Sequence, residues 1–379
     1  MIYLDYAATT KPRQEVVEAM MPYFIEQWYN PSSLHSNAAK IKQDVEKARK
    51  IVGNFIGANG NEIYFTSGGS ESNCWAISGF CHYWNVLNIR PVIITSIIEH
   101  KSILECVKNM IADVYYVDVD DNGLIKLDVL SDILNDISLL NLPLLCSFQL
   151  ANNEIGTIQD IKKISNMIRC FGGYLHADCV QAFGQIPIDV DEMGIDMLSA
   201  SGHKIGCPKG IGFLYIRDGT TISPMIYGSQ MNSMRGGTEN VPYIIGLSKA
   251  LEFCDVSDKN VKEMCDKRDF FIESLESKFG CKLNGHPTER LPNNINVTFF
   301  QNITGESLLY MLDISGVAIS TGSACNSKSI EPSHVLKAIG LSNEDAMKTI
   351  RITLSDDTLY KDILDVIEEI DKSIKLIES

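Results

Sequence analysis

The strongest constraint on the fold is an alternation, between about residues 13 and 250, of helix-like periodicity with short apolar segments. The apolar segments are short enough for strands, and stretches of helical period separate them. Continuous apolar strands divided by helices indicate a mostly parallel sheet that is buried on both faces. The sequence therefore predicts an α/β architecture, with strands near residues 63–65, 92–95, 114–117, 144–148 and 174–176.

The pattern changes after about residue 255. A charged helix is expected over about 260–279, an alternating segment at 294–300 is typical of a half-exposed strand, and an amphipathic helix is expected over about 358–377. Fewer strands among longer helices indicate a smaller α+β domain. We predict a large α/β domain at 13–255 and a smaller domain at 256–379, joined by the N-terminal segment 1–12.

Charge and composition exclude several classes of protein. The 379 residues include 33 Lys and Arg against 48 Asp and Glu, a net charge of −15, which repels nucleic acid and anionic membranes. No apolar stretch is long enough to span a membrane, and no signal peptide is recognisable. The eleven cysteines form no Cys-x-x-Cys pair, so we expect buried thiols in a reducing cytoplasm and no metal site.

Two polar segments follow predicted strands, where open α/β sheets bind ligands. The segment TSGGSESN (66–73) places paired glycines before a helix, which suits backbone N–H groups to an anion. An ordinary turn capped by Ser70 is the alternative. The segment HADCVQ (176–181) places Asp178 where its carboxylate either pairs with a protonated ring nitrogen or caps the next helix.

Two further segments carry potential nucleophiles. Lys204, in SASGHK (199–204), is either a desolvated amine with a lowered pKa or a solvated loop lysine. Cys325, in STGSACNSKS (320–329), lies in a small, polar segment where core filling does not explain a cysteine. The nearby Lys328 favours its thiolate, although an inert loop thiol remains the alternative.

Together, these segments supply what pyridoxal phosphate (PLP) requires: an acid for the ring nitrogen, an amine for a Schiff base and an anion cradle. Their ordered motifs closely resemble the cysteine desulfurases of iron–sulfur cluster assembly and nitrogen fixation. The resemblance implies the PLP-dependent transferase type I fold of class V aminotransferases. It covers almost the whole chain and rests on YLDYAATT (3–10), NPSS (30–33), EHK (99–101), NNEIG (152–156), Asp178, Gln181, SGHK (201–204), GSAC (322–325) and IRI (350–352).

The resemblance implies a set of cofactor contacts. Lys204 would hold PLP through a Schiff base, Asp178 would keep the ring nitrogen protonated, and His100 would stack on the ring and move protons. Thr238, in MRGGT (234–238), matches a residue contributed by the neighbouring subunit, which implies a homodimer. The remaining contacts are those to the phenolic oxygen, from Gln181 and Asn153, and those to the phosphate, from Gly69, Ser70, Ser201 and His203.

The resemblance also implies the reaction. Arg351 would bind the carboxylate of L-cysteine, with Asn153 beside it, although a structural salt bridge is the alternative for Arg351. Cys325 would take the substrate sulfur as a persulfide, release L-alanine and pass the sulfur to an iron–sulfur scaffold or a thiolation protein. Selenocysteine lyase or another class V aminotransferase activity is the alternative on the same fold, and a non-catalytic sulfur relay is a third hypothesis.

Overall fold

The computed structural model describes residues 1–321 and 332–378. Within these residues the larger part of the chain is built on a seven-stranded sheet of order β2-β8-β7-β6-β5-β3-β4. Only β8 runs antiparallel to its neighbours, so the prediction of a mostly parallel sheet is confirmed. The strands are β2 (Ile63–Thr66), β3 (Val92–Ser96), β4 (Asp113–Val117), β5 (Leu144–Gln149), β6 (Tyr174–Asp178), β7 (Met197–Ser201) and β8 (Gly212–Ile216).

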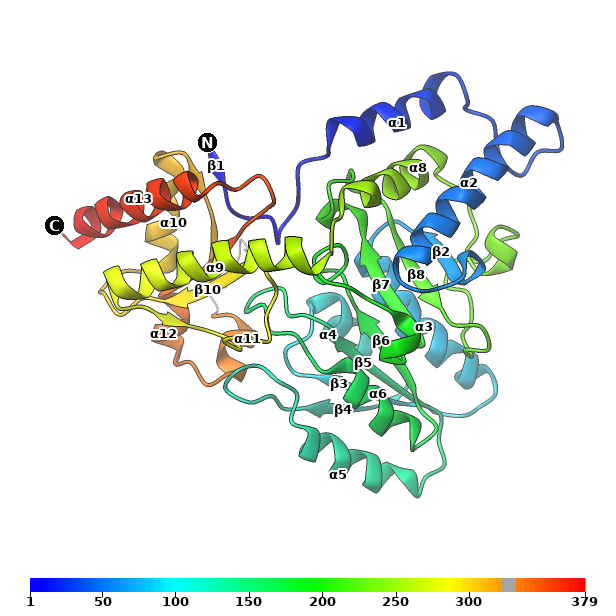
Figure 1. The fold of residues 1–379 in the computed structure, drawn as a ribbon. Helices are drawn as coiled ribbons and strands as arrows, with labels where there is room; N and C mark the ends of the chain where they lie inside the picture. The colour runs from blue at the N-terminus through cyan, green and yellow to red at the C-terminus, as the bar shows by residue number, and fades with distance from the viewer. Residues whose placement is uncertain (322–331, 379) are drawn as a thin grey trace.

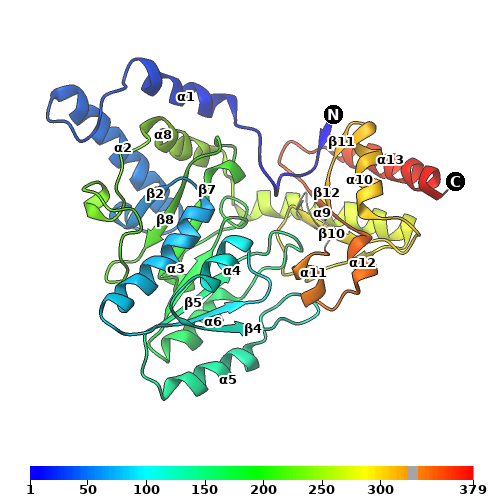
Figure 2. The same ribbon diagram turned by 180° about the vertical axis from the view of Figure 1, so that it is seen from behind.

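Helices cover both faces of this sheet (Figures 1 and 2). Successive strand residues point to opposite faces, so Ile93 packs with Trp75 of α3 on one face, whereas Ile94 belongs to the core on the other face. One face is covered by α3 (Gly69–Val86) and α4 (Lys101–Lys108). The other face is covered by α2 (Ser36–Phe55), α5 (Leu127–Ser138), α6 (Ile161–Arg169) and α8 (Val241–Ala250), with α1 (Gln14–Ile25) packed on α8.

A second, antiparallel sheet of order β12-β13-β10-β9 lies in the C-terminal part of the chain described here. Phe271, Val297 and Ile350 are fully buried in its separate hydrophobic core. The division of the chain at residue 255 stays a prediction. The elements are α9 (Asp258–Phe279), β9 (Lys282–Leu283), β10 (Asn294–Thr298), α10 (Gly305–Ile314), β12 (Ser320–Thr321), α11 (His334–Ala338), α12 (Asn343–Met347), β13 (Thr349–Thr353) and α13 (Tyr360–Glu378).

The N-terminal segment connects the two sheets. β1 (Ile2–Tyr3) pairs in parallel with β11 (Val317–Ala318) of the C-terminal part. The chain then crosses to the large sheet, where the backbone N–H of Thr10 donates to the carbonyl of His203, and continues into α1 (Figure 1). The segment is therefore held at both of its ends.

The prediction of a half-exposed strand at 294–300 is wrong. All five residues of β10 are buried, because its polar face packs against the loop that follows β5 instead of water. Asn294 and Asn296 each donate a side-chain hydrogen bond to the backbone carbonyl of Glu154, over 3.3 and 3.2 Å. Alternation of polar and apolar residues marks two different environments, and here the polar one is a contact between the two sheets.

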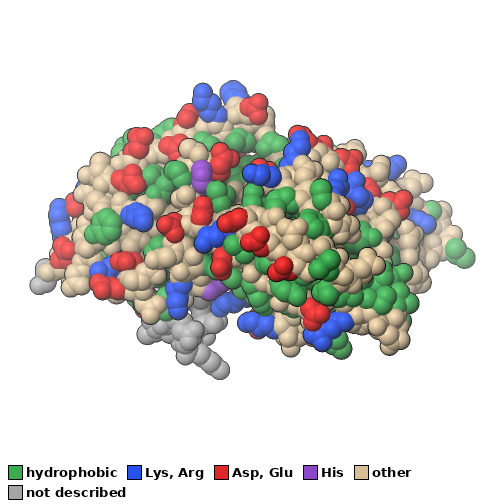
Figure 3. All heavy atoms as spheres, turned by 90° about the horizontal axis from the view of Figure 1, so that it is seen from below, with side chains coloured by type: hydrophobic (Ala, Val, Ile, Leu, Met, Phe, Trp, Pro, Cys, Tyr) green, Lys and Arg blue, Asp and Glu red, His purple; other side chains and the backbone are tan. Residues whose placement is uncertain are grey.

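No helix in the two described ranges is long and apolar enough to cross a membrane. On the face shown in Figure 3, acidic and basic side chains are interspersed. That face therefore presents a mixed charge distribution.

Replacing Phe271 with alanine tests the smaller core. The Phe271 side chain is completely buried, so Phe271→Ala is expected to lower the free energy of unfolding by about 3–5 kcal/mol. Phe300 is 64% exposed, and Phe300→Ala should change it by no more than about 0.5 kcal/mol. Denaturant unfolding of both variants measures the difference. Equal losses would contradict the assignment of Phe271 to a packed core.

Candidate active site

Two glycines shape the turn between β2 and α3. Gly68 has a φ of +153°, a conformation that side chains rarely adopt, and a Cβ on Gly69 would lie 2.5 Å from Val180 Cγ2. The buried Ser201 hydroxyl faces this turn, 3.6 Å from the position that a Gly68 Cβ would take. The first N–H groups of α3, at Gly69 and Ser70, begin an 18-residue helix and so favour an anion. The turn therefore has the form of a phosphate cradle.

Asp178 ends β6 and is buried in the protein interior. Its Oδ1 accepts a hydrogen bond from the backbone N–H of Val180 over 3.0 Å, and its Oδ2 accepts one from Asn73 Nδ2 over 2.8 Å. Burial raises the pKa of Asp178, while these hydrogen bonds and the nearby charges of His100 and Lys204 oppose the rise. The carboxylate is therefore fixed in orientation and lies within electrostatic reach of His100 and Lys204.

A chain of hydrogen bonds leads from Asp178 to His100. Asn73 Nδ2 also donates to Ser102 Oγ over 3.0 Å, and that oxygen lies 2.8 Å from His100 Nδ1. The backbone N–H of Ser102 donates to the same ring nitrogen over 3.1 Å, so Nδ1 is an acceptor and the neutral ring carries its proton on Nε2. Although the residue is exposed in part, desolvation by the surrounding protein lowers the pKa of His100, and the Asp178 charge opposes that shift.

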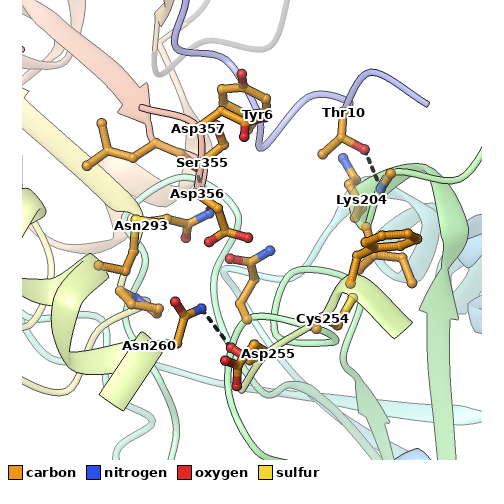
Figure 4. Close-up of a pocket in the computed structure, with 18 of the residues that line it drawn as sticks. Tyr6, Thr10, Lys204, Cys254, Asp255, Asn260, Asn293, Ser355, Asp356 and Asp357 are labelled. Atoms are coloured by element: carbon orange, nitrogen blue, oxygen red, sulfur yellow. Dashed lines mark hydrogen bonds between the residues drawn. The ribbon is translucent and has the colours of Figure 1, made fainter. Parts of the chain in front are cut away.

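Lys204 lies in a short turn after β7 and faces the N-terminal segment. Its ammonium group donates to the backbone carbonyls of Ala7 and Ala8, the latter over 2.9 Å. Burial lowers the pKa of Lys204 to about 8, with a further contribution from the positive charge of Arg351. A cavity of about 160 Å³ lies beside it, with Lys204 and Thr10 on one side and Asn293 and Asp356 on the other (Figure 4).

The N-terminal segment also contacts two other predicted cofactor ligands. Gln181 Nε2 donates to the carbonyl of Ala7 over 3.1 Å, and His203 Nδ1 lies 3.2 Å from Thr9 Oγ1. Asn153, in the loop after β5, accepts a hydrogen bond through Oδ1 from Gln149 over 3.1 Å. The structure therefore brings Gln181, His203 and Lys204 together under residues 7–9.

Arg351, in β13, reaches this region from the smaller sheet. Its Nη2 pairs with Asp5 Oδ1 over 2.8 Å, and its Nη1 donates to the carbonyl of Asn153 over 3.0 Å. Its Nε is buried and has no hydrogen-bond partner within residues 1–321 and 332–378. The salt bridge that was the alternative interpretation of Arg351 thus exists. Among the described residues, none accepts a hydrogen bond from the remaining guanidinium donor.

Two predicted residues are not brought to the site by the described chain. Thr238 is exposed in the loop before α8, where the neighbouring Arg235 pairs with Glu71 of α3 over 3.1 Å. Cys325 lies outside the described residues.

Asn73 and two buried acids are the main residues that the sequence prediction missed. Asn73 is a polar residue on the buried side of α3. A polar residue at a buried helix position is the sequence signal that could have identified it. Burial raises the pKa of Glu99 to about 8, and Ser96 Oγ donates to its Oε1 over 2.6 Å. Burial also raises the pKa of Glu154 to about 7, and Ser333 donates a short hydrogen bond to its carboxylate. Spacing alone does not reveal that either acid is buried.

Comparison with known proteins decides the family. Residues 2–366 match the family described as aminotransferase class V. The chain belongs to the class V aminotransferase family. One curated relative is cysteine desulfurase IscS of Dictyoglomus turgidum, which is 44% identical to this chain over 99% of this chain and 96% of that protein. It is also 44% identical to cysteine desulfurase IscS of Methanosarcina thermophila, over 99% of this chain and 93% of that protein.

Solved structures agree with the assignment of this chain to the family. A NifS-like protein superposes with a TM-score of 0.88 at 31% identity, over 100% of this chain and 99% of the other. A structure described as SspA in complex with cysteine gives a TM-score of 0.80 at 36% identity, over 93% and 99% of the two chains. The predicted PLP-dependent transferase fold and the resemblance to cysteine desulfurases are therefore confirmed.

The family uses PLP, and the residues of this chain fit that cofactor. A buried carboxylate suits a protonated ring nitrogen, and a helix N-terminus behind paired glycines suits a phosphate. A lysine with a lowered pKa suits condensation with an aldehyde. Groups that suit the ring nitrogen, the phosphate and the aldehyde of PLP thus lie at the ends of β6, β2 and β7.

The lowered pKa of Lys204 is open to direct measurement in the protein prepared without PLP. Only the neutral amine attacks an aldehyde, so reductive alkylation of Lys204 should increase with pH around a midpoint near 8. A lysine side chain in a model peptide titrates near 10.4 and serves as the reference. Peptide mapping of the modification at each pH gives the midpoint. A value near that of the model peptide would show that burial does not lower the pKa.

Proposed function

We propose that this protein is a cysteine desulfurase that converts L-cysteine to L-alanine and transfers the sulfur to a protein cysteine as a persulfide. The sulfur would supply iron–sulfur clusters or other thio-cofactor or tRNA pathways. The observation that carries the proposal is the joint placement of Asp178, His100 and Lys204 in a chain whose curated relatives are cysteine desulfurases. When bound, PLP supplies an electron-accepting ring that stabilises negative charge at the substrate α-carbon.

The cofactor-binding roles follow from position and chemistry. Lys204 would bind the aldehyde carbon, and Asp178 would accept a hydrogen bond from the protonated ring nitrogen. Because Asn73 and Val180 N fix both carboxylate oxygens, Asp178 needs no rearrangement to do so. Gln181 and Asn153 would contact the phenolic oxygen, whereas the phosphate would lie on Gly69, Ser70, Ser201 and His203.

His100 is suited to stack on the ring and to move protons. Its Nδ1 accepts from Ser102, so its Nε2 is the nitrogen left to exchange a proton with substrate. The protein lowers its pKa, which keeps the imidazole neutral and able to accept a proton near pH 7. Asn73 would act as a positioning residue, because a single amide joins His100, through Ser102, to Asp178.

Arg351 would bind the carboxylate of L-cysteine, with Asn153 beside it. Nε, which has no partner in the described part of the chain, and Nη2, which pairs with Asp5, make a planar pair of donors. A substrate carboxylate would compete with Asp5 for this guanidinium. Binding of substrate is thereby linked to the N-terminal segment that covers Lys204.

Cys325 would be the nucleophile that takes the sulfur from substrate and passes it to an acceptor protein. Thr238 would complete the phosphate site of a second subunit, and this proposed role requires a homodimer. We also propose a cytoplasmic location, which suits the ten described cysteines, because all of them are free thiols.

The role of Cys325 is tested by its replacement with alanine. Cys325→Ala should reduce release of sulfide and L-alanine from L-cysteine in the presence of reductant by at least about 100-fold, because the sulfur loses its acceptor. The visible absorbance of bound PLP should remain. Cys170→Ala, which removes an exposed cysteine at the end of α6, is the matched control and should retain activity.

Full activity of Cys325→Ala would contradict the assignment of the nucleophile. Retained activity with selenocysteine alone would identify a selenocysteine lyase. Keto acid formed in place of alanine would identify an aminotransferase.

Arg351 is tested against its salt-bridge partner. Arg351→Gln should raise the KM for L-cysteine about 10- to 100-fold, the loss expected for a charge-assisted hydrogen bond, with a smaller effect on kcat. Asp5→Asn removes the same ion pair but leaves the guanidinium, so its KM should change much less. Equal increases in KM for the two variants would mean that Arg351 serves only the salt bridge.

A further inference from the structure

Two cysteines from different helices lie in contact beside the site. Cys74, in the second turn of α3, and Cys106, near the end of α4, have their sulfur atoms 3.4 Å apart. They are 32 residues apart in the sequence, so no Cys-x-x-Cys spacing marks them. The S–H of Cys106 also lies 3.8 Å from the backbone carbonyl of Cys74.

The two sulfur atoms are in non-bonded contact. A disulfide has its sulfur atoms about 2.05 Å apart, so the two sulfurs need to approach by only about 1.4 Å. Rotation about the Cα–Cβ bonds and a small adjustment of the two packed helices supply displacements of this size. Cys74 is half-buried and Cys106 is buried, so a reagent from solvent meets Cys74 first.

Cys74 also has the chemistry of an attacking thiol. A hydrogen bond from Cys106 outweighs burial and lowers the pKa of Cys74 to about 7. The same contact and burial raise the pKa of Cys106, which therefore stays protonated until its partner has reacted. Cys81 and Cys207 are buried, and burial raises the pKa of each to about 12. A thiolate is thus favoured at Cys74 over these two cysteines.

We propose that Cys74 and Cys106 form a redox-active dithiol, which a small-molecule disulfide oxidises to an intramolecular disulfide. Cys74 thiolate attacks one sulfur of the oxidant, forms a mixed disulfide and releases one thiolate. Cys106 then loses its proton and attacks Cys74 Sγ, releasing the second thiolate. Two protein thiols are oxidised, one disulfide reagent is reduced to two thiols, and the protons go to the released thiolates.

The pair lies next to the hydrogen-bond chain of the proposed active site. Asn73 precedes Cys74, and Ser102 lies one helical turn before Cys106, so the thiol pair and the Asn73–Ser102 hydrogen bond of 3.0 Å join the same two helices at neighbouring positions. Closing the disulfide draws α3 and α4 together at this point. The redox state is thereby coupled to the orientation of His100, a consequence that rests on the proposed function.

The test is oxidation of the full chain with oxidised glutathione, followed by peptide mass mapping without reduction. We expect a peptide pair joined through Cys74 and Cys106 that dithiothreitol separates. In Cys106→Ser, glutathione should remain attached to Cys74, because no second thiol displaces it. In Cys74→Ser the cross-link should vanish and Cys106 should stay unmodified, whereas Cys170→Ser should form the cross-link as wild type does.

A cross-link between Cys106 and Cys81, stable glutathione on Cys74 of wild type, or no reaction at either thiol would overturn the proposal. Repeating the mapping in a Cys325→Ala background removes the proposed competing nucleophile. Because mass mapping needs neither PLP nor activity, its failure is distinct from a failure of the proposed function. NMR titration of the His100 imidazole should give different midpoints before and after oxidation, and equal midpoints would refute the coupling.

Discussion

The hydrogen bond between Asn73 and the buried carboxylate of Asp178 is the interaction on which the site depends. A carboxylate deep in a protein is costly unless its oxygens are satisfied, and this one is satisfied by one side-chain amide and one backbone N–H. Because the same amide also holds Ser102, the first turns of α3 and α4 are fixed relative to the end of β6. The position of His100 therefore follows from the way that a single acid is buried.

A second polar contact holds the smaller sheet against the larger one. The loop after β5 presents the carbonyl of Glu154 to Asn294 and Asn296 of β10, and its carboxylate to Ser333 at the start of α11. Arg351, one strand away in β13, extends the contact to Asn153 and Asp5. The same contact between the two sheets would thus position the residues that bind substrate and those that hold the cofactor.

Most of the fold and much of the site could be predicted from the sequence, for different reasons. The strands of the large sheet were predictable because burial on both faces produces short, continuous apolar segments at 92–95 and 144–148. The placement of Asp178 and Lys204 at one edge of the sheet was predictable, because polar residues that follow such segments lie where open α/β sheets bind ligands. Their roles toward a cofactor were implied only by the family resemblance and stay predictions. The exposure of β10 was mispredicted, because a polar face gives the same alternation whether it meets water or another polar surface.

Other features depend on contacts between segments that are distant in the sequence, and local sequence patterns do not predict such contacts. The partner of Asn73 lies 105 residues away, and the contact between Cys74 and Cys106 requires two helices to pack on one face of the sheet. The raised pKa values of Glu99 and Glu154 likewise arise from burial, which the assembled fold creates.

The N-terminal strand has a consequence for the order in which the molecule is assembled during synthesis. β1 precedes every other described element in the chain, yet its partner β11 lies more than 300 residues downstream, at Val317 and Ala318. The central sheet is complete by residue 216 and can form while β1 still has nothing to pair with. The pairing of β1 is therefore completed late in biogenesis, so Lys204 already lies on a folded sheet before the N-terminal segment that contacts it is held at both of its ends.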